Sequence, residues 1–572
     1  MKPVRLPASA TLALPRWGLI ALCLLYILPG LVRRDPWKTD DAAGFGIMWT
    51  MARGALEDWL SPNIVGMPMP HEGPLAFWIG AVFIRLFGWI MGDAFAARIS
   101  TLIFFLIGAL SVWYAAYLLG RRSEVQPLRL AFGGQPEAKD YGRTLADGAL
   151  LIYLASLGLL LRSHETTADA LHISLIAFAL YAAIRLFDAS AWRSALVLGV
   201  TLGLMTLTRG WIVPTALLAA LAILAVVRNK SLLVPLALAT LPATLAVSAI
   251  WPVANHYFLP PDLSPTDEWL LWNKHQFGSM SWESTYYLLK NAIWFSWPAW
   301  PFAGWAVYAW RKQYTALHIV LPCTFLASFI LLVLCNPHAG EENLLPLLPP
   351  LAILAAFGLP TMKRGAINAV DWFAVMTLTS CAAFIWIGWI AKQTGWPAQI
   401  AKNAFKLAPG FKPEFNLMAL LIAAAATIGW VMLVLWRVSR QPSVLWRAVV
   451  LSSGGVILCW LLLMTLWLPW LNYGKSYAGV AQQMVKKLPA TSSYCVESNV
   501  GPSQRASFAY FGNVQFAEGN ERNCRFALSQ DSVKNKNAAR NLKQFEGKWE
   551  LLWEGRRPSD RDERFRLYKR MN

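Results

Sequence analysis

The sequence predicts an all-α polytopic membrane protein of about thirteen transmembrane helices, followed by a small α/β domain. Three observations carry this prediction. Of the 572 residues, 56% are hydrophobic and only 15% are charged, whereas a soluble domain usually carries about 25% charge. Long apolar runs alternate with short basic connectors. This alternation stops near residue 470, and the remaining residues are more polar.

The apolar runs have the length that a helix needs to cross a bilayer. We expect a transmembrane domain at residues 1–470, with a long first outer loop at 33–97, and a separate small domain at 471–572. The predicted spans are residues 17–32, 98–119, 146–162, 170–187, 194–208, 211–227, 234–257, 291–310, 315–335, 343–360, 368–391, 416–437 and 447–470.

Basic residues in the connectors predict the orientation of the membrane domain, because positive charge stays on the cytoplasmic side. Residues that fall on one common side include Arg185, Arg193, Arg228, Lys230, Arg311 and Lys312. This pattern places the N-terminus in the cytoplasm and the C-terminus in the periplasm of an inner-membrane protein. The apolar segment from Leu75 to Met91 would reverse every later connector if it crossed, so we expect an interfacial helix on the outer surface.

The formal net charge of +19 does not indicate a nucleic-acid partner, because much of it lies in the connectors. The small domain is also basic, which fits either attraction to anionic lipid headgroups or a solvated surface. Its sequence predicts a helix at 477–488 and strands at 505–516, 549–555 and 564–570. Cys495 and Cys524 stand in polar sequence and either form a disulfide in an oxidising periplasm or remain free.

Three acidic clusters lie in predicted outer loops. They are Asp40 with Asp41, His71 with Glu72, and His164 with Glu165 and Asp169. Asp169 stands at the mouth of an apolar span, where a carboxylate is costly unless it is paired, hydrated or functional. Each cluster alone could be a helix N-cap or a solvated loop charge. Their common side of the membrane favours a shared catalytic site.

These clusters belong to an ordered set of motifs that resembles the GT-C glycosyltransferases of the lipid A aminoarabinose transferase and protein O-mannosyltransferase type. Asp40-Asp41 resembles the family's acidic pair after the first helix, and residues 72–78 resemble its Glu-Lys-Pro-Pro-Leu-x-x-Trp motif. Further similar elements are Ala96-Ala97-Arg98-Ile99, Ala168-Asp169-Ala170-Leu171, Leu207-Thr208-Arg209-Gly210 and residues 343–349. The chain departs from the family pattern at Gly73, where lysine is common, at Asn343, where tyrosine is common, and at Asp41, where glutamate is usual.

The resemblance implies a GT-C-like fold and an inverting transfer of a sugar from a polyprenyl-phosphate donor on the periplasmic face. The expected acceptor is lipid A or another envelope glycan or lipid, ahead of a protein hydroxyl. The expected catalytic residues are Asp40, Asp41, Glu72 and Asp169, with Asp40 as the base. Glu72 and Asp169 would either orient the acceptor or hold a divalent cation.

The departing phosphate needs cations near the outer surface. The candidates are Arg98, Arg209, Lys274 and His275. For Arg209 the alternative is snorkelling to a headgroup, and for Lys274 and His275 it is a solvated loop. The substrate cavity is expected to include His71, His164, Glu165, His338, Glu342 and Asn343.

Two other functions remain open from the sequence. A polyprenyl-lipid or polysaccharide transporter or flippase would carry charges near helix midpoints and pseudo-repeated halves, whereas the acidic residues here cluster in loops. A non-catalytic binding protein could keep the same scaffold. The enzyme hypothesis requires that Asp40, Glu72 and Asp169 meet in one pocket beside the outlet of a lipid-binding groove.

Overall fold

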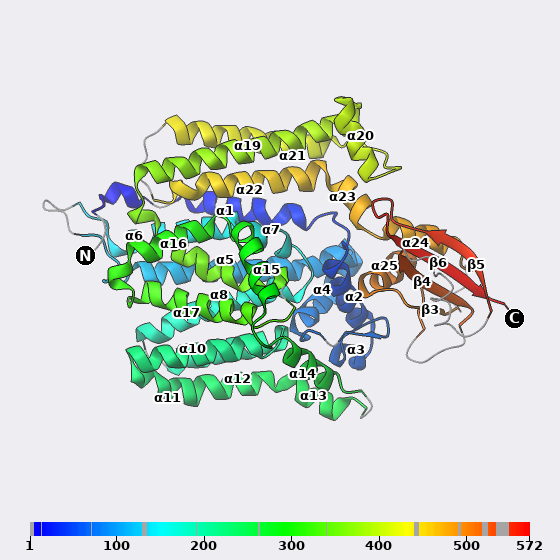
Figure 1. Cartoon of the computed structure of the whole chain (residues 1–572), viewed down its shortest axis with the longest axis horizontal. Helices are drawn as coiled ribbons and strands as arrows, with labels where there is room; N and C mark the ends of the chain where they lie inside the picture. The colour runs from blue at the N-terminus through cyan, green and yellow to red at the C-terminus, as the bar shows by residue number, and fades with distance from the viewer. Residues whose placement is uncertain are drawn as a thin grey trace.

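The computed structural model is an elongated helical bundle with a small sheet domain at one end, and the two chain termini lie at opposite ends (Figure 1). The structure describes residues 5–12, 14–69, 71–128, 134–189, 192–260, 263–338, 340–439, 445–489, 494–517, 524–532 and 548–571.

The helices of the bundle are, in chain order, α1 (Arg16–Ile27), α2 (Asp40–Arg53), α3 (Leu56–Leu60), α4 (Leu75–Met91), α5 (Asp93–Gly120), α6 (Ala138–Ala155), α7 (Leu157–Arg162), α8 (Ala168–Ala189), α9 (Trp192–Thr208), α10 (Ile212–Arg228), α11 (Leu233–Pro235), α12 (Leu241–Ser248), α13 (Ile250–Phe258), α14 (Pro265–His275), α15 (Trp282–Phe295), α16 (Ala299–Ala309), α17 (Leu317–Leu334), α18 (Leu348–Ala356), α19 (Arg364–Thr394), α20 (Ala398–Leu407), α21 (Leu417–Ser439), α22 (Arg447–Leu466) and α23 (Leu468–Lys475). A short antiparallel hairpin, β1 (Asn63–Ile64) and β2 (Met67–Pro68), lies between α3 and α4.

Within the described residues, nine segments are long and apolar enough to cross a membrane, as expected of a multi-pass membrane protein. They are Ala8–Gly30, Asp93–Gly120, Ala168–Asp188, Lys230–Phe258, Leu317–Leu334, Glu341–Thr361, Gly365–Thr394, Leu417–Arg437 and Val449–Leu466. The helices α4, α9 and α10 are apolar but shorter. The predicted number of thirteen spans therefore stays a prediction.

Two of the predicted spans are broken at places that lie next to each other. The predicted span 146–162 breaks at Ser156, whose backbone is extended between α6 and α7. The predicted span 291–310 breaks between α15 and α16. The two breaks lie side by side, because the Leu157 N–H donates a hydrogen bond to the carbonyl of Trp297 at 3.1 Å. The N–H group left free at the first break thus finds its acceptor in a carbonyl group at the second break.

The long helix α5 lies at the centre of the bundle and packs against α4, α6 and α8. Small residues permit close approach at these contacts. A Cβ atom added at Gly108 would lie 2.9 Å from the Ser174 hydroxyl of α8, and one added at Gly120 would lie 2.9 Å from the Cα of Gly142 in α6. The packing of α5 fixes the position of α8, which carries Asp169.

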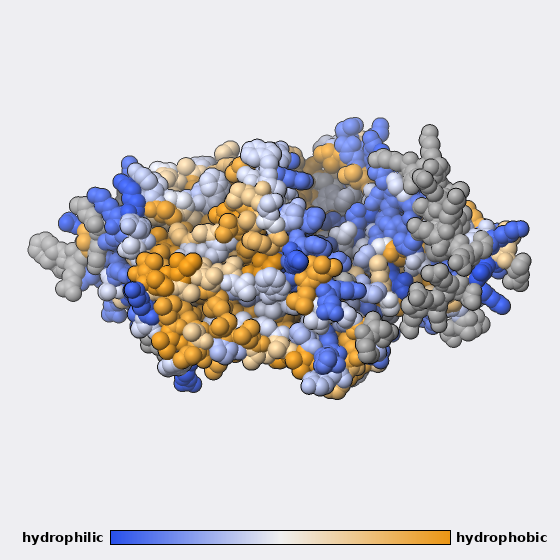
Figure 2. Space-filling view, turned by 60° about the horizontal axis from the view of Figure 1, so that its bottom comes forward, coloured by the Kyte–Doolittle hydropathy of each residue, from blue (hydrophilic) through white to orange (hydrophobic). Residues whose placement is uncertain are grey.

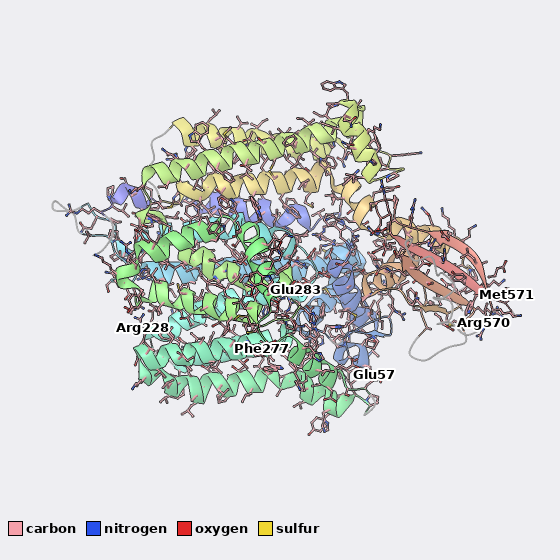
Figure 3. The ribbon with its side chains drawn as sticks, viewed as in Figure 1. Glu57, Arg228, Phe277, Glu283, Arg570 and Met571 are labelled. Atoms are coloured by element: carbon pink, nitrogen blue, oxygen red, sulfur yellow. A yellow bond between two sulfur atoms is a disulfide. The ribbon has the colours of Figure 1, made fainter. Side chains whose placement is uncertain are left out.

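The surface of the bundle is apolar where a membrane would surround it. Figure 2 shows hydrophobic side chains gathered along the bundle and hydrophilic ones at both ends. Exposed apolar residues of α10 to α12 include Ile223, Val227, Leu238 and Leu245. In Figure 3, Arg228 lies at one end of the bundle, whereas Glu57, Arg570 and Met571 lie toward the other.

The small domain contains the helices α24 (Ala478–Val485) and α25 (Pro502–Gly512) and the strands β3 (Val496–Ser498), β4 (Phe526–Ser532), β5 (Trp549–Gly555) and β6 (Glu563–Arg570). The strand order is β3-β4-β6-β5, with β3 parallel to β4 and the other pairs antiparallel. Apolar side chains of β4 and β6 pack against the helices. The predicted α/β character is confirmed, and β5 has the bounds that the alternation predicted.

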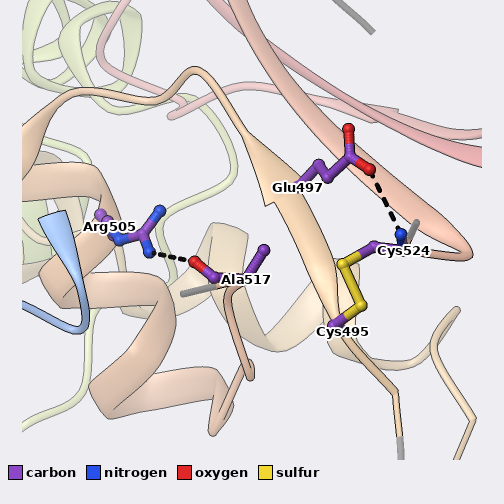
Figure 4. Close-up of a disulfide and its surroundings, with 5 residues drawn as sticks. All are labelled: Cys495, Glu497, Arg505, Ala517 and Cys524. Carbon is purple, nitrogen blue, oxygen red and sulfur yellow. Dashed lines mark hydrogen bonds between the residues drawn. A yellow bond between two sulfur atoms is a disulfide. The ribbon is translucent and has the colours of Figure 1, made fainter. Parts of the chain in front are cut away.

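The strand predicted at 505–516 is wrong, because α25 occupies most of it. The signals of a helix are present there: Pro502 stands at the first helical position, and Asn513 closes the helix in the left-handed conformation at φ 49°. Cys495 and Cys524 form a disulfide that joins the beginnings of β3 and β4 (Figure 4).

The small domain is packed directly on α2. The guanidinium group of Arg505 donates hydrogen bonds to the carbonyls of Ile64 at 3.0 Å and Ala517 at 3.0 Å. The Ala517 contact appears in Figure 4. The ring of Tyr510 packs edge-on against Phe45 of α2, with the ring centroids 4.8 Å apart. The domain thus holds the helix whose first residue is Asp40.

Candidate active site

The helix α2 begins with two adjacent carboxylates that lie in different surroundings. The side chain of Asp40 is 57% exposed, whereas that of Asp41 is fully enclosed. Consecutive residues of a helix are separated by about 100° around its axis, so the two side chains cannot point the same way. The sequence grouped them as one catalytic pair, and the structure places only Asp40 on a cavity.

Asp41 is held by a complete set of buried partners. Its Oδ2 accepts hydrogen bonds from Arg34 at 3.1 Å and Arg98 at 3.2 Å, and its Oδ1 accepts one from the Thr166 N–H at 2.8 Å. Burial alone raises the pKa of Asp41, but the two guanidinium groups and the N–H donors outweigh it and hold that pKa below its usual range. Asp41 therefore joins the start of α2 to the loop before α8.

A cavity of about 300 Å³ opens beside the exposed Asp40. Glu72, from the loop before α4, and Asp169, from the first turn of α8, line the same space. This arrangement agrees with the expectation that the three carboxylates share one pocket. We call this space the carboxylate cavity; His71, Arg209 and Glu342 also line it.

Gly73 brings the loop that carries Glu72 against the end of α9. A Cβ atom at this position would lie 2.0 Å from the carbonyl oxygen of Leu207, so no residue with a side chain fits there without a shift of the backbone. Burial raises the pKa of Glu72 to about 7, although Arg209 opposes this rise, and the charge of Asp169 adds to it. The lysine that is common at this motif position has no room in this chain.

Asp169 lies between two arginines. Its Oδ1 accepts a hydrogen bond from Arg209, and its Oδ2 lies 3.7 Å from an Nη atom of Arg162. Arg162 also contacts Asp40 at 2.9 Å and Glu165 at 3.2 Å. It is therefore the cation that links the carboxylates of α2 and α8, and it was not among the cations predicted from the sequence.

A second and narrower space, of about 70 Å³, adjoins the carboxylate cavity. We call it the groove. Arg209, Trp272 and Glu342 line both spaces and so mark their junction. Beyond the junction, apolar side chains of two apolar helices line the groove: Ile212 and Val213 of α10, and Phe329, Leu332 and Val333 of α17. A polar cavity thus adjoins a partly apolar groove.

Several predicted site residues line neither space. They are Asp41, Arg98, His164, Glu165, Lys274, His275 and His338. Lys274 and His275 are exposed at the end of α14, whereas their neighbours Trp272 and Asn273 line the groove. Arg98 is buried and donates to Asp41 and to the carbonyl of Asp35 at 2.9 Å.

His164 and Glu165 are buried beside the carboxylate cavity. The ring nitrogens of His164 lie 2.6 Å from the carbonyl oxygen of Leu160 and 3.0 Å from that of Tyr26. Burial lowers the pKa of His164 to about 3, although both carbonyls oppose this fall, and the ring links α7 to the end of α1. Burial also raises the pKa of Glu165 to about 7, against the attraction of Arg162.

Of the remaining predicted residues, His71, Glu342 and Asn343 line the cavity or the groove, and His338 is exposed nearby. Two further residues of the site were not predicted, although each carries a signal in the sequence. Arg162 is a lone cation at the outer end of a predicted apolar span, against the positive-inside rule. His172 is a polar residue about one turn after Asp169, in the predominantly apolar part of α8.

Among the residues that the structure describes, no group of three or more His, Cys, Asp or Glu side chains is arranged to hold a metal ion. The two residues considered for a divalent cation, Glu72 and Asp169, share the cavity, but Asp169 is already paired with Arg209. The donor set of Glu72 and Asp169 therefore does not fit a metal centre.

Comparison with solved structures identifies the fold. The structure of ArnT from Cupriavidus metallidurans bound to undecaprenyl phosphate aligns with a TM-score of 0.66 and 14% identity, over 96% of this chain and 97% of that one. ArnT in the apo state aligns with a TM-score of 0.64 and 15% identity, with the same coverage. The archaeal oligosaccharyltransferase AglB from Archaeoglobus fulgidus gives a TM-score of 0.44 and 10% identity, over 90% of this chain and 69% of that one.

The chain thus has the fold of ArnT over almost its whole length, in agreement with the fold that the ordered motifs implied. No protein-family model and no curated protein sequence matches the chain.

Proposed function

We propose that this protein is a membrane glycosyltransferase that moves a sugar from a polyprenyl-phosphate donor to a hydroxyl of an envelope acceptor on the periplasmic face. The observation that carries the proposal is the meeting of Asp40, Glu72 and Asp169 in one cavity that adjoins a groove along apolar helices. The ArnT fold supports it, because one ArnT structure holds undecaprenyl phosphate. A lipid A-type or other glycan or lipid acceptor is favoured over a protein hydroxyl.

Asp40 is the proposed general base. It is the carboxylate of the cavity that is most open to an incoming hydroxyl, whereas Asp169 is held by Arg209. Asp40 would take the proton of the acceptor hydroxyl as its oxygen attacks the anomeric carbon. The bond from that carbon to the phosphate oxygen breaks, its electron pair leaves with the polyprenyl phosphate, and the configuration inverts.

The other residues would position the reactants. Arg209 lies at the junction of the two spaces, so its charge would stabilise the departing phosphate. Burial raises the pKa of Glu72 to about 7, so its carboxyl group can carry a proton near neutral pH. It can therefore donate a hydrogen bond to a sugar hydroxyl or accept one.

The test compares envelope lipids by mass spectrometry between a parent strain and a strain that lacks this gene. We expect a sugar mass increment to disappear on deletion and to return with the wild-type chain. Asp40→Asn should not restore it, because an amide cannot take up the proton. Asp267→Asn, on an exposed surface of α14 away from both spaces, is the matched control and should restore it fully. Full restoration by Asp40→Asn at normal expression would refute the base assignment.

A further inference from the structure

His172 is a buried polar residue, and no contact within the described structure accounts for a histidine at this position. It stands one turn after Asp169 in α8, so the two side chains lie on the same side of the helix. The residue is only 4% exposed. Its Nδ1 is buried and has no hydrogen-bond partner among the described residues. Buried polar atoms in proteins are almost always paired, and the ring that carries this unpaired atom borders a space that a ligand can enter.

The ring of His172 borders the groove rather than the carboxylate cavity. It shares this lining with Arg209 and with the apolar residues of α10 and α17. A ligand in the groove would therefore meet two polar donors at the end beside the carboxylate cavity and hydrocarbon surface beyond them. An amphiphile with an anionic head and an apolar tail has this chemistry.

A phosphate at this junction needs a hydrogen-bond donor in addition to Arg209, because little positive charge lines the two spaces. Among the described residues that line either space, Arg209 is the one permanent cation. Asp169 already accepts a hydrogen bond from it, and Glu342 lies at the same junction. A phosphate that arrives there meets a guanidinium group that is partly neutralised. An imidazole N–H can donate to a phosphate oxygen without requiring any further charge in the membrane domain.

We infer that His172 is a donor-binding residue, whose imidazole hydrogen-bonds the phosphate of a polyprenyl-phosphate lipid in the groove next to Arg209. This inference rests on the proposed function and adds to it the residue that completes the phosphate site. It also gives the two spaces different roles, because the groove then holds the lipid phosphate and the carboxylate cavity holds the acceptor.

The test measures binding of undecaprenyl phosphate to the purified full-length chain in detergent, beside its thermal unfolding temperature. His172→Leu should weaken binding by about 10-fold or more, since it removes the hydrogen bond and leaves the apolar packing. His172→Asn should retain more of the affinity, because its amide N–H can still donate a hydrogen bond. Asp40→Asn should bind as the wild type does while losing sugar transfer.

His318 provides the matched control. It is another fully buried histidine, in α17, enclosed by the rings of Trp310 and Phe357. It precedes Phe329, the nearest groove residue of α17, by eleven positions, which is roughly 16 Å along a helix. His318→Leu should leave the binding of undecaprenyl phosphate unchanged, whatever its effect on unfolding.

The outcomes separate this inference from the proposed function. Wild-type affinity in His172→Leu, with transfer intact, would overturn the role of His172 and leave the glycosyltransferase proposal standing. A wild-type chain that neither binds undecaprenyl phosphate nor transfers sugar would overturn both. If His172→Leu fails to fold, His172→Asn and His172→Phe are compared instead. Weaker binding by His172→Phe than by His172→Asn supports the inference, and equal binding by both contradicts it.

Discussion

Arg162 contacts carboxylates from three separate parts of the chain. Its guanidinium group lies 2.9 Å from Asp40, 3.7 Å from Asp169 and 3.5 Å from Glu341. These groups would repel one another without a cation between them. The side chain of Arg162 is only 14% exposed, but those of Asp40 and Glu341 are 57% and 60% exposed. Water therefore screens the contact with Asp169, which is 6% exposed, the least. A single residue thus sets the spacing of the proposed base and its neighbours.

Replacement of Arg162 by glutamine should reduce sugar transfer by about 100-fold, since a displacement of the base by about 1 Å has an effect of that order. Arg162→Lys should recover part of the activity, because it restores the charge without the fork of the guanidinium group. The measurement is the transfer rate at saturating donor in vesicles. Arg228→Gln, at the far end of α10, is the control, and an equal loss in that variant would contradict a local effect.

The pH dependence of stability should reveal Glu72. Burial raises its pKa from 4.5 to about 7, so between these values the folded state binds the proton more tightly than the unfolded state. Its contribution to stability is therefore complete below pH about 4.5 and is lost as the pH rises through 7. We expect the unfolding temperature to fall between pH 5 and 8, and Glu72→Gln to make that fall smaller. An unchanged slope in Glu72→Gln would show that this carboxyl is not responsible.

At the scale of elements, the site depends on how closely a loop and a helix end approach one another. Gly73 contacts the backbone of Leu207, two residues before Arg209. The loop before α4 and the end of α9 are thereby held together, and Glu72 and Arg209 meet in the cavity. The start of α2 is fixed in a comparable way by Asp41, which accepts hydrogen bonds from two buried arginines.

Gly73→Ala should therefore separate the loop from α9 and reduce transfer by at least about 10-fold, because the new Cβ atom would overlap the carbonyl of Leu207. The substitution should also lower the unfolding temperature. Gly304→Ala in α16 is the control, since a Cβ atom there meets nothing within 4 Å. The measurement is sugar transfer by both variants. Wild-type activity in Gly73→Ala would mean that the close approach of the loop to α9 is not required.

At the scale of the molecule, the bundle has two polar ends that differ in character. One end carries Arg228, and the other carries the small domain with its disulfide (Figure 1, Figure 3). The small domain packs on α2, whose first residue, Asp40, lines the carboxylate cavity. The basic connectors predict that the first end is cytoplasmic. A disulfide is typical of an oxidising compartment, which agrees with a periplasmic small domain.

Thiol labelling in intact cells tests this orientation. A cysteine introduced at Met571 should react with a membrane-impermeant reagent, and one introduced at Arg228 should react only after the membrane is permeabilised. The parent chain gives the background from its five free cysteines. The reverse pattern would contradict the predicted topology and would move the carboxylate cavity to the cytoplasmic face.

The sequence by itself determined the multi-pass helical class, the bounds of α4, the small α/β domain and the acidic clusters that supply carboxylates to the cavity. These follow from apolar length, from periodicity and from motifs in a fixed order, all of which are local along the chain. The prediction from sequence failed where a short alternation of apolar and polar residues was ambiguous. At α25 this alternation suggested a strand, whereas the proline at the start and the asparagine at the end indicate a helix.

Only the tertiary structure decided which members of each cluster face the cavity. Asp40 faces it and Asp41 does not, and Trp272 lines the groove whereas Lys274 is exposed. Residues one or two positions apart on a helix point in different directions, and their surroundings depend on packing against distant segments. The contacts of Arg162 with Asp40 and Glu341 join residues far apart in the sequence, so no local pattern could have predicted them.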